Sequence, residues 1–369
     1  MAEKVGYAVV GLGHIAQEQV LPAFANAPNA RLVALVSDER EKREKLGAHY
    51  GVRHLYGYDE YDACLANEEV DAVYVALPND MHCDYTVRAA RAGVHVLCEK
   101  PMALDETSCR TMIRACDDAG VKLMIAYRLH FEEANLEAIE LLRRGAIGTP
   151  RFFTSAFGYQ LQGGNIRSSG ARGGGPVWDL GVYCVNAARY LFRAEPEEVF
   201  AWTLPGRPGD ERFAEVEAGA TAVLRFSGGR TATFTVDFDC GAVATYRVVG
   251  TEGDLRLDNA YEYGMPRVRQ LDHGGEVEER RFEIVDQFGP ELQYFAGCIL
   301  EDRQPEPDGE EGLADVRIVE AIFRSAAEGR PVRLEAFERR RRPGEAQAHH
   351  LAGKEERPPL VDVEAPSAD

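Results

Sequence analysis

The sequence predicts an α/β fold in which a doubly wound parallel sheet is followed by a second α+β domain with a large, mostly antiparallel open sheet. In the first third of the chain, short β-rich runs lie at 6–10, 31–36, 72–76, 94–98 and 122–126. Apolar residues at helical spacing lie between them at 22–26, 40–50, 80–92 and 105–119. This alternation is typical of parallel strands joined by crossover helices.

The periodicity changes beyond residue 129. Helical patterns at 132–144 and 177–191 flank a Gly-rich loop at 158–175. β-rich runs then follow at 198–203, 217–226, 230–238, 242–250 and 254–257, joined by turns such as Ser-Gly-Gly and Glu-Gly-Asp. Such a series predicts an antiparallel sheet, and a helix at 318–327 is expected to cover one of its faces.

The length of 369 residues and the 45% hydrophobic content predict more than one domain. We expect a cofactor-binding domain at 1–128, a substrate-binding and oligomerisation domain at 129–335, and a mobile tail at 336–369. The tail is rich in charge, Ala and Pro and has no apolar periodicity. Within it, 339–342 is interpreted as a solvated run of arginines rather than an anion-binding patch, and His349-His350 as inert rather than a metal site. No metal is expected.

The formal net charge of -19 disfavours nucleic acid and anionic membranes as partners. The 8 cysteines are scattered and form no CxxC pair, which favours reduced thiols. The N-terminal residues lack a basic region and a cleavage site, and no apolar stretch approaches about 18 residues. We therefore expect a cytoplasmic protein without an export signal or a membrane span.

A glycine motif follows the first predicted strand and opens a helical segment. It reads Gly11-Leu12-Gly13-His14-Ile15-Ala16. Gly11 permits a tight turn, Gly13 lets the backbone approach a pyrophosphate, and Ala16 keeps helix and strand close. The N–H groups at the helix start face the anion. The motif therefore predicts a dinucleotide site.

The end of the second predicted strand should meet the adenosine ribose. Asp38 there could accept a hydrogen bond from a ribose 2′-hydroxyl and so favour NAD. Ser37, Arg40 and Lys42 could hold a 2′-phosphate and so favour NADP. Arg40 and Lys42 could equally form ion pairs along a charged helix face, so the choice between NAD and NADP stays open.

The segment after the third predicted strand runs from Ala76 to His82 at the carboxyl edge of the sheet, where ligands bind in open α/β folds. Asn79 and His82 are candidates for contact with the dinucleotide. For His82, purely structural contacts on a helix face are the alternative.

When Glu99-Lys100-Pro101 is considered together with the motifs above, the chain resembles the glucose-fructose oxidoreductase, inositol dehydrogenase and rhizopine catabolism protein family. Glu-Lys-Pro is the most specific mark of the resemblance. The resemblance also covers 11–16, 77–82, 127–128, 173–183, 309–317 and 329–332, and spans roughly 4–334. The motif Asp179-x-x-x-Tyr183 is closest to the glucose-fructose oxidoreductase branch, because inositol dehydrogenases carry His in place of the tyrosine.

The resemblance implies a Rossmann domain followed by a mixed α/β domain whose open sheet often forms a subunit interface, so a homodimer or homotetramer is expected. It implies NADP as the usual cofactor of the branch, although Asp38 stands where that branch commonly has a small residue. The cofactor-binding residues expected are Gly11, Gly13, His14, Ile15, Ser37, Asp38, Lys42, Leu77, Asn79, His82, Glu99, Lys100 and Arg128. Tyr127-Arg128 could also simply pack at the domain junction.

The residue chemistry points to Lys100, Asp179 and Tyr183 as catalytic and substrate-binding groups. Oxidation of a carbinol by a nicotinamide needs a base for the hydroxyl proton, and an adjacent ammonium makes a tyrosine a better base. Asp179 and Tyr183 stand four residues apart, so they share one helix face. Arg167, in the Gly-rich loop, is a further substrate-binding candidate, with an ordinary surface arginine as the alternative.

The function expected is hydride transfer between NAD(P) and a sugar or polyol CH–OH or carbonyl group, as in an aldose dehydrogenase or reductase. Two other functions fit the same fold. One is an NAD-dependent glycosidase that uses transient oxidation, and the other is a non-catalytic NAD(P)-binding regulator. Intact Lys100, Asp179 and Tyr183 disfavour the regulator, which has no need of a proton-transfer group.

Overall fold

The computed structural model describes residues 4–339, 341–348, 351, 360–363 and 365–367. The chain forms two compact units. The first comprises 1–131, 285–313 and 349–365, and the second comprises 132–284, 314–348 and 366–369. Residues 285–313, expected in the second domain, thus cluster with the first unit. Among the described residues no helix is both long and apolar enough to cross a bilayer.

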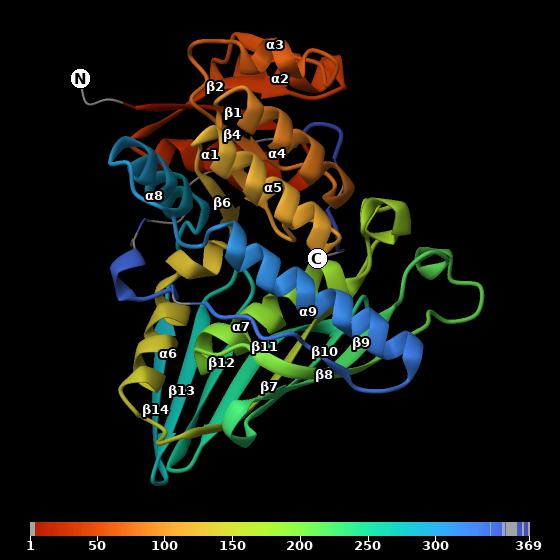
Figure 1. Ribbon diagram of the computed structural model, residues 1–369, viewed down its shortest axis with the longest axis vertical. Coiled ribbons are helices and arrows are strands. Elements are labelled where there is room, and N and C mark those ends of the chain that lie inside the picture. Colours follow the sequence, from red (N-terminus) through yellow and green to blue (C-terminus); the bar gives the residue numbers. More distant parts are fainter. Residues whose placement is uncertain (1–3, 340, 349–350, 352–359, 364, 368–369) are drawn as a thin grey trace. The chain divides into compact units, whose positions relative to one another are not determined.

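The first unit contains a six-stranded sheet in the order β3-β2-β1-β4-β5-β6, with every neighbouring pair parallel (Figure 1). Its strands are β1 (Val5–Val10), β2 (Ala30–Val36), β3 (His54–Tyr56), β4 (Ala72–Val75), β5 (His95–Glu99) and β6 (Leu123–Ala126). This order, with a switch point between β1 and β4, is that of a dinucleotide-binding doubly wound sheet. The prediction of a parallel α/β first domain is confirmed.

Helices connect the strands of this sheet. They are α1 (Leu21–Ala23), α2 (Arg40–Tyr50), α3 (Tyr61–Leu65), α4 (His82–Arg91) and α5 (Glu106–Ala119), while α8 (Phe288–Leu300), which comes much later in the chain, also belongs to the first unit. Shorter helical turns are η1 (Ala16–Val20), η2 (Phe24–Asn26), η3 (Asn79–Met81) and η4 (Arg128–Phe131). α4 packs on β4 and β5, whereas α8 packs on β1 and β2. α8, which was not predicted, therefore completes the cover of the first sheet.

The second unit contains a nine-stranded sheet in the order β14-β13-β12-β11-β7-β10-β9-β8-β15. The strands are β7 (Pro150–Gln160), β8 (Pro196–Leu204), β9 (Gly219–Phe226), β10 (Thr231–Asp237), β11 (Asp239–Gly250), β12 (Gly253–Asp258), β13 (Arg267–His273), β14 (Glu276–Phe282) and β15 (Val332–Arg333). β7 and β10 pair in parallel, and the other neighbouring pairs are antiparallel. The prediction of a mostly antiparallel sheet is confirmed.

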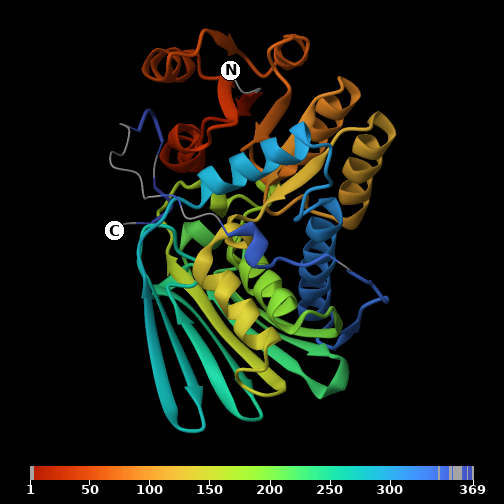
Figure 2. The ribbon, with the colours of Figure 1, turned by 90° about the vertical axis from the view of Figure 1, so that its left-hand side faces the viewer.

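One face of this sheet is covered by helices (Figures 1 and 2). They are α6 (Glu133–Arg143), α7 (Val182–Phe192) preceded by η7 (Val177–Gly181), and α9 (Gly309–Glu328), of which residues from 314 on belong to the second unit. Short helical turns are η5 (Ile166–Ser168), η6 (Gly170–Arg172), η8 (Glu211–Phe213), η9 (Ser227–Gly229) and η10 (Glu345–Gln347). The predicted helix at 318–327 begins earlier, at Gly309.

Four strands of the second sheet were missed by the sequence analysis, namely β7, β13, β14 and the two-residue β15. β13 directs Arg267 and Arg269 inward, where they are 1% and 2% exposed. Arg267 pairs with Glu132 at 3.5 Å, and Arg269 pairs with Glu137 at 3.0 Å. Charged residues at inward positions do not produce the apolar alternation by which a half-buried strand is recognised. β14, in contrast, is exposed along nearly its whole length.

The described residues of the segment expected to be a mobile tail make specific contacts within each unit. Arg342 donates a hydrogen bond to Glu195 at 2.5 Å, and the Val361 N–H donates to Gln17 at 2.8 Å. The predicted arginine run at 339–342 includes one residue outside the described part of the chain, and His349-His350 lies outside it entirely.

A buried ion cluster joins α7 to α9 within the second unit. Arg189 contacts Asp315 at 2.6 Å and Glu195 at 2.6 Å, and neither the Arg189 nor the Asp315 side chain is exposed to solvent. Asn186 donates a further hydrogen bond of 2.9 Å to Asp315. Asp315 thus supplies a negative charge and hydrogen-bond acceptors at a position that solvent does not reach.

We predict that Asp315→Ala lowers the free energy of unfolding by about 3 kcal/mol, because the buried Arg189 loses one of the two carboxylates that compensate its charge. Urea denaturation of the purified protein measures this loss. The matched control is Asp254→Ala, which breaks the pair with Arg247, whose side chain is 54% exposed. That change should cost less than about 1 kcal/mol, and equal losses for the two variants would contradict the prediction.

Candidate functional site

The glycine motif lies at the carboxyl end of β1 and leads into the helical stretch that starts at Ala16. Gly11 has a φ of +93°, and a Cβ at this position would lie 2.4 Å from the Ala76 carbonyl oxygen. Gly13 is exposed, and a Cβ there would meet nothing within 4 Å. The backbone at Gly13 is therefore open to a ligand, and His14 and Ile15 beside it are partly exposed. This cradle fits the pyrophosphate of a dinucleotide.

The residues after β2 combine acidic and basic groups. Ser37 is buried and Asp38 is exposed. The Lys42 ammonium contacts the Glu39 carboxylate, and Arg40 pairs with Glu44 at 2.7 Å. Arg40 and Lys42 thus form ion pairs along the helix. Such ion pairs were the alternative to binding a 2′-phosphate.

Arg43 was not singled out from the sequence, yet it lies beside this strand end. Its guanidinium donates to the Ser37 carbonyl oxygen at 2.5 Å and to the Asp38 carbonyl oxygen at 3.2 Å. Only the fold shows this, because a basic residue one turn into a charged helix carries no distinguishing pattern.

The loop after β4 carries Leu77, which is buried, and Asn79, which is partly exposed. His82 is completely buried, and its Nδ1 and Nε2 atoms lie 2.9 Å from the carbonyl oxygens of Pro101 and Leu77. Burial lowers the pKa of His82. The two ring nitrogens thus face two backbone carbonyl oxygens, of which a neutral imidazole can donate to one. His82 ties the loop after β4 to the loop after β5.

Glu99 and Lys100 stand at the end of β5, and both are partly exposed. Tyr74 donates a hydrogen bond of 2.8 Å to Glu99, and the Lys100 N–H donates to Glu99 at 3.3 Å. Burial raises the pKa of Glu99, and the nearby charge of Lys100 opposes this shift. The Glu-Lys-Pro motif thus brings the positive charge of Lys100 near enough to the Glu99 carboxyl group to affect its pKa.

Arg128 and Tyr127 follow β6. Arg128 is 4% exposed and donates a hydrogen bond to Gln287, at the start of α8. Tyr127 is buried and its ring stacks on His130 with a centroid distance of 5.4 Å. Both side chains thus make contacts within the first unit.

In the second unit, Asp179 and Tyr183 are partly exposed on a helical stretch whose neighbouring residues are buried. Arg167 contacts Asp179 at 2.6 Å, and Tyr159 donates to the same carboxylate at 3.3 Å. Burial would lower the pKa of Arg167, but Asp179, together with the hydroxyls of Tyr159 and Tyr263, raises that pKa above its ordinary value. The Gly-rich loop thus brings Arg167 to Asp179, and Tyr159 was missed because β7 was missed.

The Tyr183 ring is held by aromatic neighbours. Its centroid lies 5.7 Å from that of Phe157 and 6.0 Å from that of Tyr261. Edge and tilted ring contacts of this kind fix the orientation of an aromatic side chain. The arrangement offers a carboxylate, a guanidinium and an oriented phenol within one unit, a set suited to binding hydroxyl groups and moving a proton.

A carboxyl group that sequence reasoning missed lies at the start of this helical stretch. Glu217 accepts a hydrogen bond of 3.1 Å from the Val177 N–H. Gly175 has a φ of +97°, and a Cβ there would lie 2.6 Å from Glu217 Oε1. Burial raises the pKa of Glu217 to about 7. Glu217 therefore anchors the helix that carries Asp179 and Tyr183.

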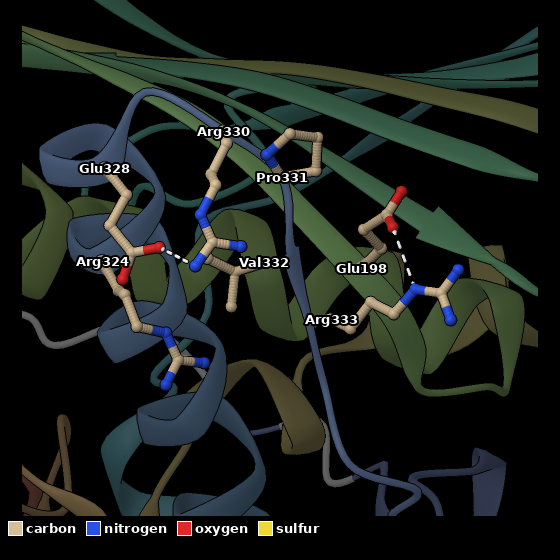
Figure 3. Close-up of a pocket in the computed structure, with 7 residues that line it drawn as sticks. All are labelled: Glu198, Arg324, Glu328, Arg330, Pro331, Val332 and Arg333. Carbon is tan, nitrogen blue, oxygen red and sulfur yellow. Dashed lines mark ion pairs between the residues drawn. The ribbon is translucent and has the colours of Figure 1, made fainter.

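A charge-rich cavity of about 530 Å³ lies elsewhere in the second unit, where α9 ends and β15 begins (Figure 3). It is lined by Glu198, Arg324, Glu328, Arg330, Pro331, Val332 and Arg333. Arg330 pairs with Glu328 at 2.6 Å, and Arg333 pairs with Glu198 at 3.7 Å. None of the predicted site residues lines it. Within the described part of the chain, no group of three or more His, Cys, Asp or Glu side chains could hold a metal ion.

We predict that Glu217→Gln alters the pH dependence of stability. The native pKa of Glu217, about 7, exceeds the ordinary value of 4.5, so between these two values the folded chain binds the proton more tightly than the unfolded chain. The stability contributed by this proton is complete below pH 4.5 and is lost as the pH rises toward 7. Relative to the variant, wild type should lose on the order of 1 to 3 kcal/mol across this interval in urea denaturation. Parallel pH curves for the two proteins would refute this.

Comparison with known proteins places these features in context. The model of an oxidoreductase family with an NAD-binding Rossmann fold matches residues 5–127, and that of the GFO/IDH/MocA C-terminal domain matches residues 135–256. A D-xylose 1-dehydrogenase (NADP⁺) from Haloarcula marismortui is 34% identical over 340 residues, which cover 90% of this chain and 93% of the relative.

Solved structures are similar over nearly the same length. An aldose-aldose oxidoreductase from Caulobacter crescentus, complexed with glycerol, superposes with a TM-score of 0.86 at 41% identity, covering 90% of this chain and 100% of the other. A 3-ketoreductase from Actinomadura kijaniata, in complex with NADP and TDP-benzene, superposes with a TM-score of 0.80 at 27% identity, covering 88% of this chain and 98% of the other.

Proposed function

The chain belongs to the GFO/IDH/MocA family of oxidoreductases with an NAD-binding Rossmann fold, and on that premise we propose that it transfers a hydride between a nicotinamide dinucleotide and a CH–OH or carbonyl carbon of a sugar or polyol. The observation that carries the proposal is the cluster of Asp179, Arg167 and the oriented Tyr183 in a chain that also has the open glycine turn. The xylose dehydrogenase and the aldose-aldose oxidoreductase that resemble this chain support a sugar substrate.

The dinucleotide, when bound, supplies the hydride-accepting or hydride-donating carbon. Gly11, Gly13, His14 and Ile15 would hold its pyrophosphate, and Leu77, Asn79, Glu99 and Lys100 its nicotinamide half. We assign NADP as the preferred cofactor, since Ser37 and Arg43 form a polar and basic strand end. The NADP-dependent xylose dehydrogenase supports the same choice. Because Asp38 could accept a hydrogen bond from a ribose 2′-hydroxyl, binding of NAD stays open as well.

The proton is moved by Tyr183 in this proposal. A phenol near its reference pKa of about 10 is a weak base, and a neighbouring ammonium stabilises the phenolate. Lys100 is assigned as that ammonium. Asp179, held by Arg167 and Tyr159, would accept a hydrogen bond from a substrate hydroxyl and orient the carbinol. Arg167 would bind a second hydroxyl of the substrate.

The test is a titration with NADP and NAD, followed by a screen of aldoses, inositols and keto-sugars for a change in nicotinamide absorbance. We expect at least one free sugar or polyol to reduce or oxidise the cofactor stoichiometrically. Cleavage of a glycoside without net change in the cofactor would support the glycosidase alternative instead. Cofactor binding without turnover of any member of the panel would support a regulator.

Within this test, Tyr183→Phe should lower turnover by about 10² to 10⁴-fold while leaving cofactor affinity within about twofold, because only the proton-transfer group is lost. The matched control is Tyr190→Phe on the same helix, whose buried hydroxyl bonds to Asn135 at 3.0 Å. The control should retain most of the rate. Retention of the rate by Tyr183→Phe would remove Tyr183 from this role.

The protein is further proposed to form a homodimer or homotetramer through the second sheet. The face opposite the helices carries Phe152, Trp202 and Leu204, which are 42%, 50% and 41% exposed. Phe200 contacts Trp202 on the same face, with a ring centroid distance of 4.3 Å. Exposed apolar groups on one sheet face are typical of protein interfaces.

Trp202→Asp should therefore shift the protein toward smaller assemblies in sedimentation velocity, since a charge would be buried at the interface. The control is Leu300→Asp in the first unit, a residue that is 41% exposed. It should sediment as wild type. An unchanged assembly for Trp202→Asp would exclude this face as the interface.

We also propose a cytoplasmic location, which is supported by 8 free cysteines of which 6 are buried.

A further inference from the structure

Glu291 on α8 is a completely buried carboxyl group that the reaction proposed above does not use. Its Oε2 atom lies 3.4 Å from the Tyr74 hydroxyl. Its Oε1 atom has no hydrogen-bond partner among the described residues. A buried anionic oxygen without a donor is costly, so a bare carboxylate does not suit this position.

A second carboxyl group shares the same hydroxyl. Tyr74, itself completely buried, lies 2.8 Å from Glu99 Oε1, and Glu99 Oε2 accepts from the Lys100 N–H at 3.3 Å. A phenol has one proton and two lone pairs. It can therefore donate to only one of the two carboxyl groups, and the shorter contact assigns that proton to Glu99.

We propose that Glu291 is a neutral carboxylic acid in the native protein, and that Glu291, Tyr74 and Glu99 form a hydrogen-bond chain in which each proton points toward Glu99, which stays the anion beside Lys100. In this chain Glu291 donates a hydrogen bond to the Tyr74 hydroxyl, and Tyr74 donates one to Glu99. Each carboxyl oxygen beside the hydroxyl thus has a hydrogen-bond partner. Two carboxyl groups on one bridging hydroxyl thus differ in protonation because their surroundings differ.

The charges around the chain support this order. Burial, with the charge of Glu99 adding to it, raises the pKa of Glu291 well above its ordinary value, and Arg128 opposes the shift. Asp286 adds to the rise. Tyr74 is a further titratable neighbour of Glu291. Tyr7 also lies near Glu291, and Cys298 and Asp71 lie near Tyr7.

Glu99 differs from Glu291 in the cations that it faces. Lys100 is the largest influence that opposes the effect of burial on the pKa of Glu99, and Tyr74 and Arg128 act in the same direction. The proton therefore belongs on Glu291, the carboxyl group at the end of the hydrogen-bond chain that is farther from Lys100.

This inference rests on the proposed function for its consequence. Glu291 and Tyr74 are positioning residues that act on Lys100 through Glu99. An anionic Glu99 stabilises the Lys100 ammonium and accepts from its backbone N–H. His82 holds the next peptide of the same loop through the Pro101 carbonyl oxygen. The loop with the catalytic lysine is thus fixed from the interior of the first unit.

The first arm of the test needs neither cofactor nor substrate. We expect the infrared difference spectrum between wild type and Glu291→Gln at pH 7 to show the carbonyl stretch of one protonated carboxylic acid in wild type. Tyr74→Phe should shift this band, because the acid loses its hydrogen-bond acceptor. If Glu291→Gln fails to fold, the shift in Tyr74→Phe tests the proposal by itself. A spectrum with carboxylate bands only would overturn the inference.

The second arm is the pH profile of kcat/KM. Tyr74→Phe should move the acid limb up by about one pH unit, because Glu99 loses a donor to its charged form. The control Tyr61→Phe removes another buried hydroxyl, which donates to the Tyr85 carbonyl oxygen at 3.2 Å, and should leave the limb in place. A purely structural role for Tyr74 would lower stability without moving the limb.

Glu291→Gln distinguishes the two protonation states in the same profile, because the amide can donate to Tyr74 as the acid does. The acid limb should then stay within about 0.3 pH units of wild type. An ionised Glu291 would repel Glu99, so its replacement would instead move the limb to lower pH and overturn the inference. Absence of turnover together with the acid band would refute the proposed function alone, whereas turnover without the band would refute this inference alone.

Discussion

The parallel direction of the strands in the first sheet is the constraint on which the rest of the candidate site depends. Because β1, β2, β4, β5 and β6 all run the same way, their carboxyl ends meet at one edge. The glycine turn, the segment from Ser37 to Lys42 and the Glu-Lys-Pro motif are far apart along the chain, yet each follows one of these strands. A single backbone arrangement thereby gathers the groups that a dinucleotide requires.

Polar groups buried behind this edge hold its loops in place. His82 joins the loop after β4 to the loop after β5 through two backbone carbonyl oxygens. Tyr74, Glu99 and Glu291 connect β4, β5 and α8. Such networks are costly when a member lacks its partner, so they specify one arrangement of the loops strongly. The loops at this edge are therefore held from behind by buried polar groups.

The second unit follows a similar principle with different elements. Arg189 and Asp315 tie α7 to α9, while Glu217 holds the start of the helical stretch before α7. Asp179 and Tyr183 lie on that stretch, and Arg167 and Tyr159 reach Asp179 from a loop and from β7. The helical stretch that carries Asp179 and Tyr183 is therefore anchored at its start by a hydrogen bond and near its end by a buried ion pair.

The sequence by itself determined the parallel first sheet and the glycine turn, because these follow from local periodicity and from residue types with restricted conformations. Only the tertiary structure decided that α8 belongs with the first unit, that β13 is a strand with inward arginines, and that His82 is a structural link. It also brought Arg43, Tyr159, Glu217 and Glu291 to the candidate sites. These features depend on pairings between residues distant in the chain, and buried charges are compensated by partners that no local pattern reveals.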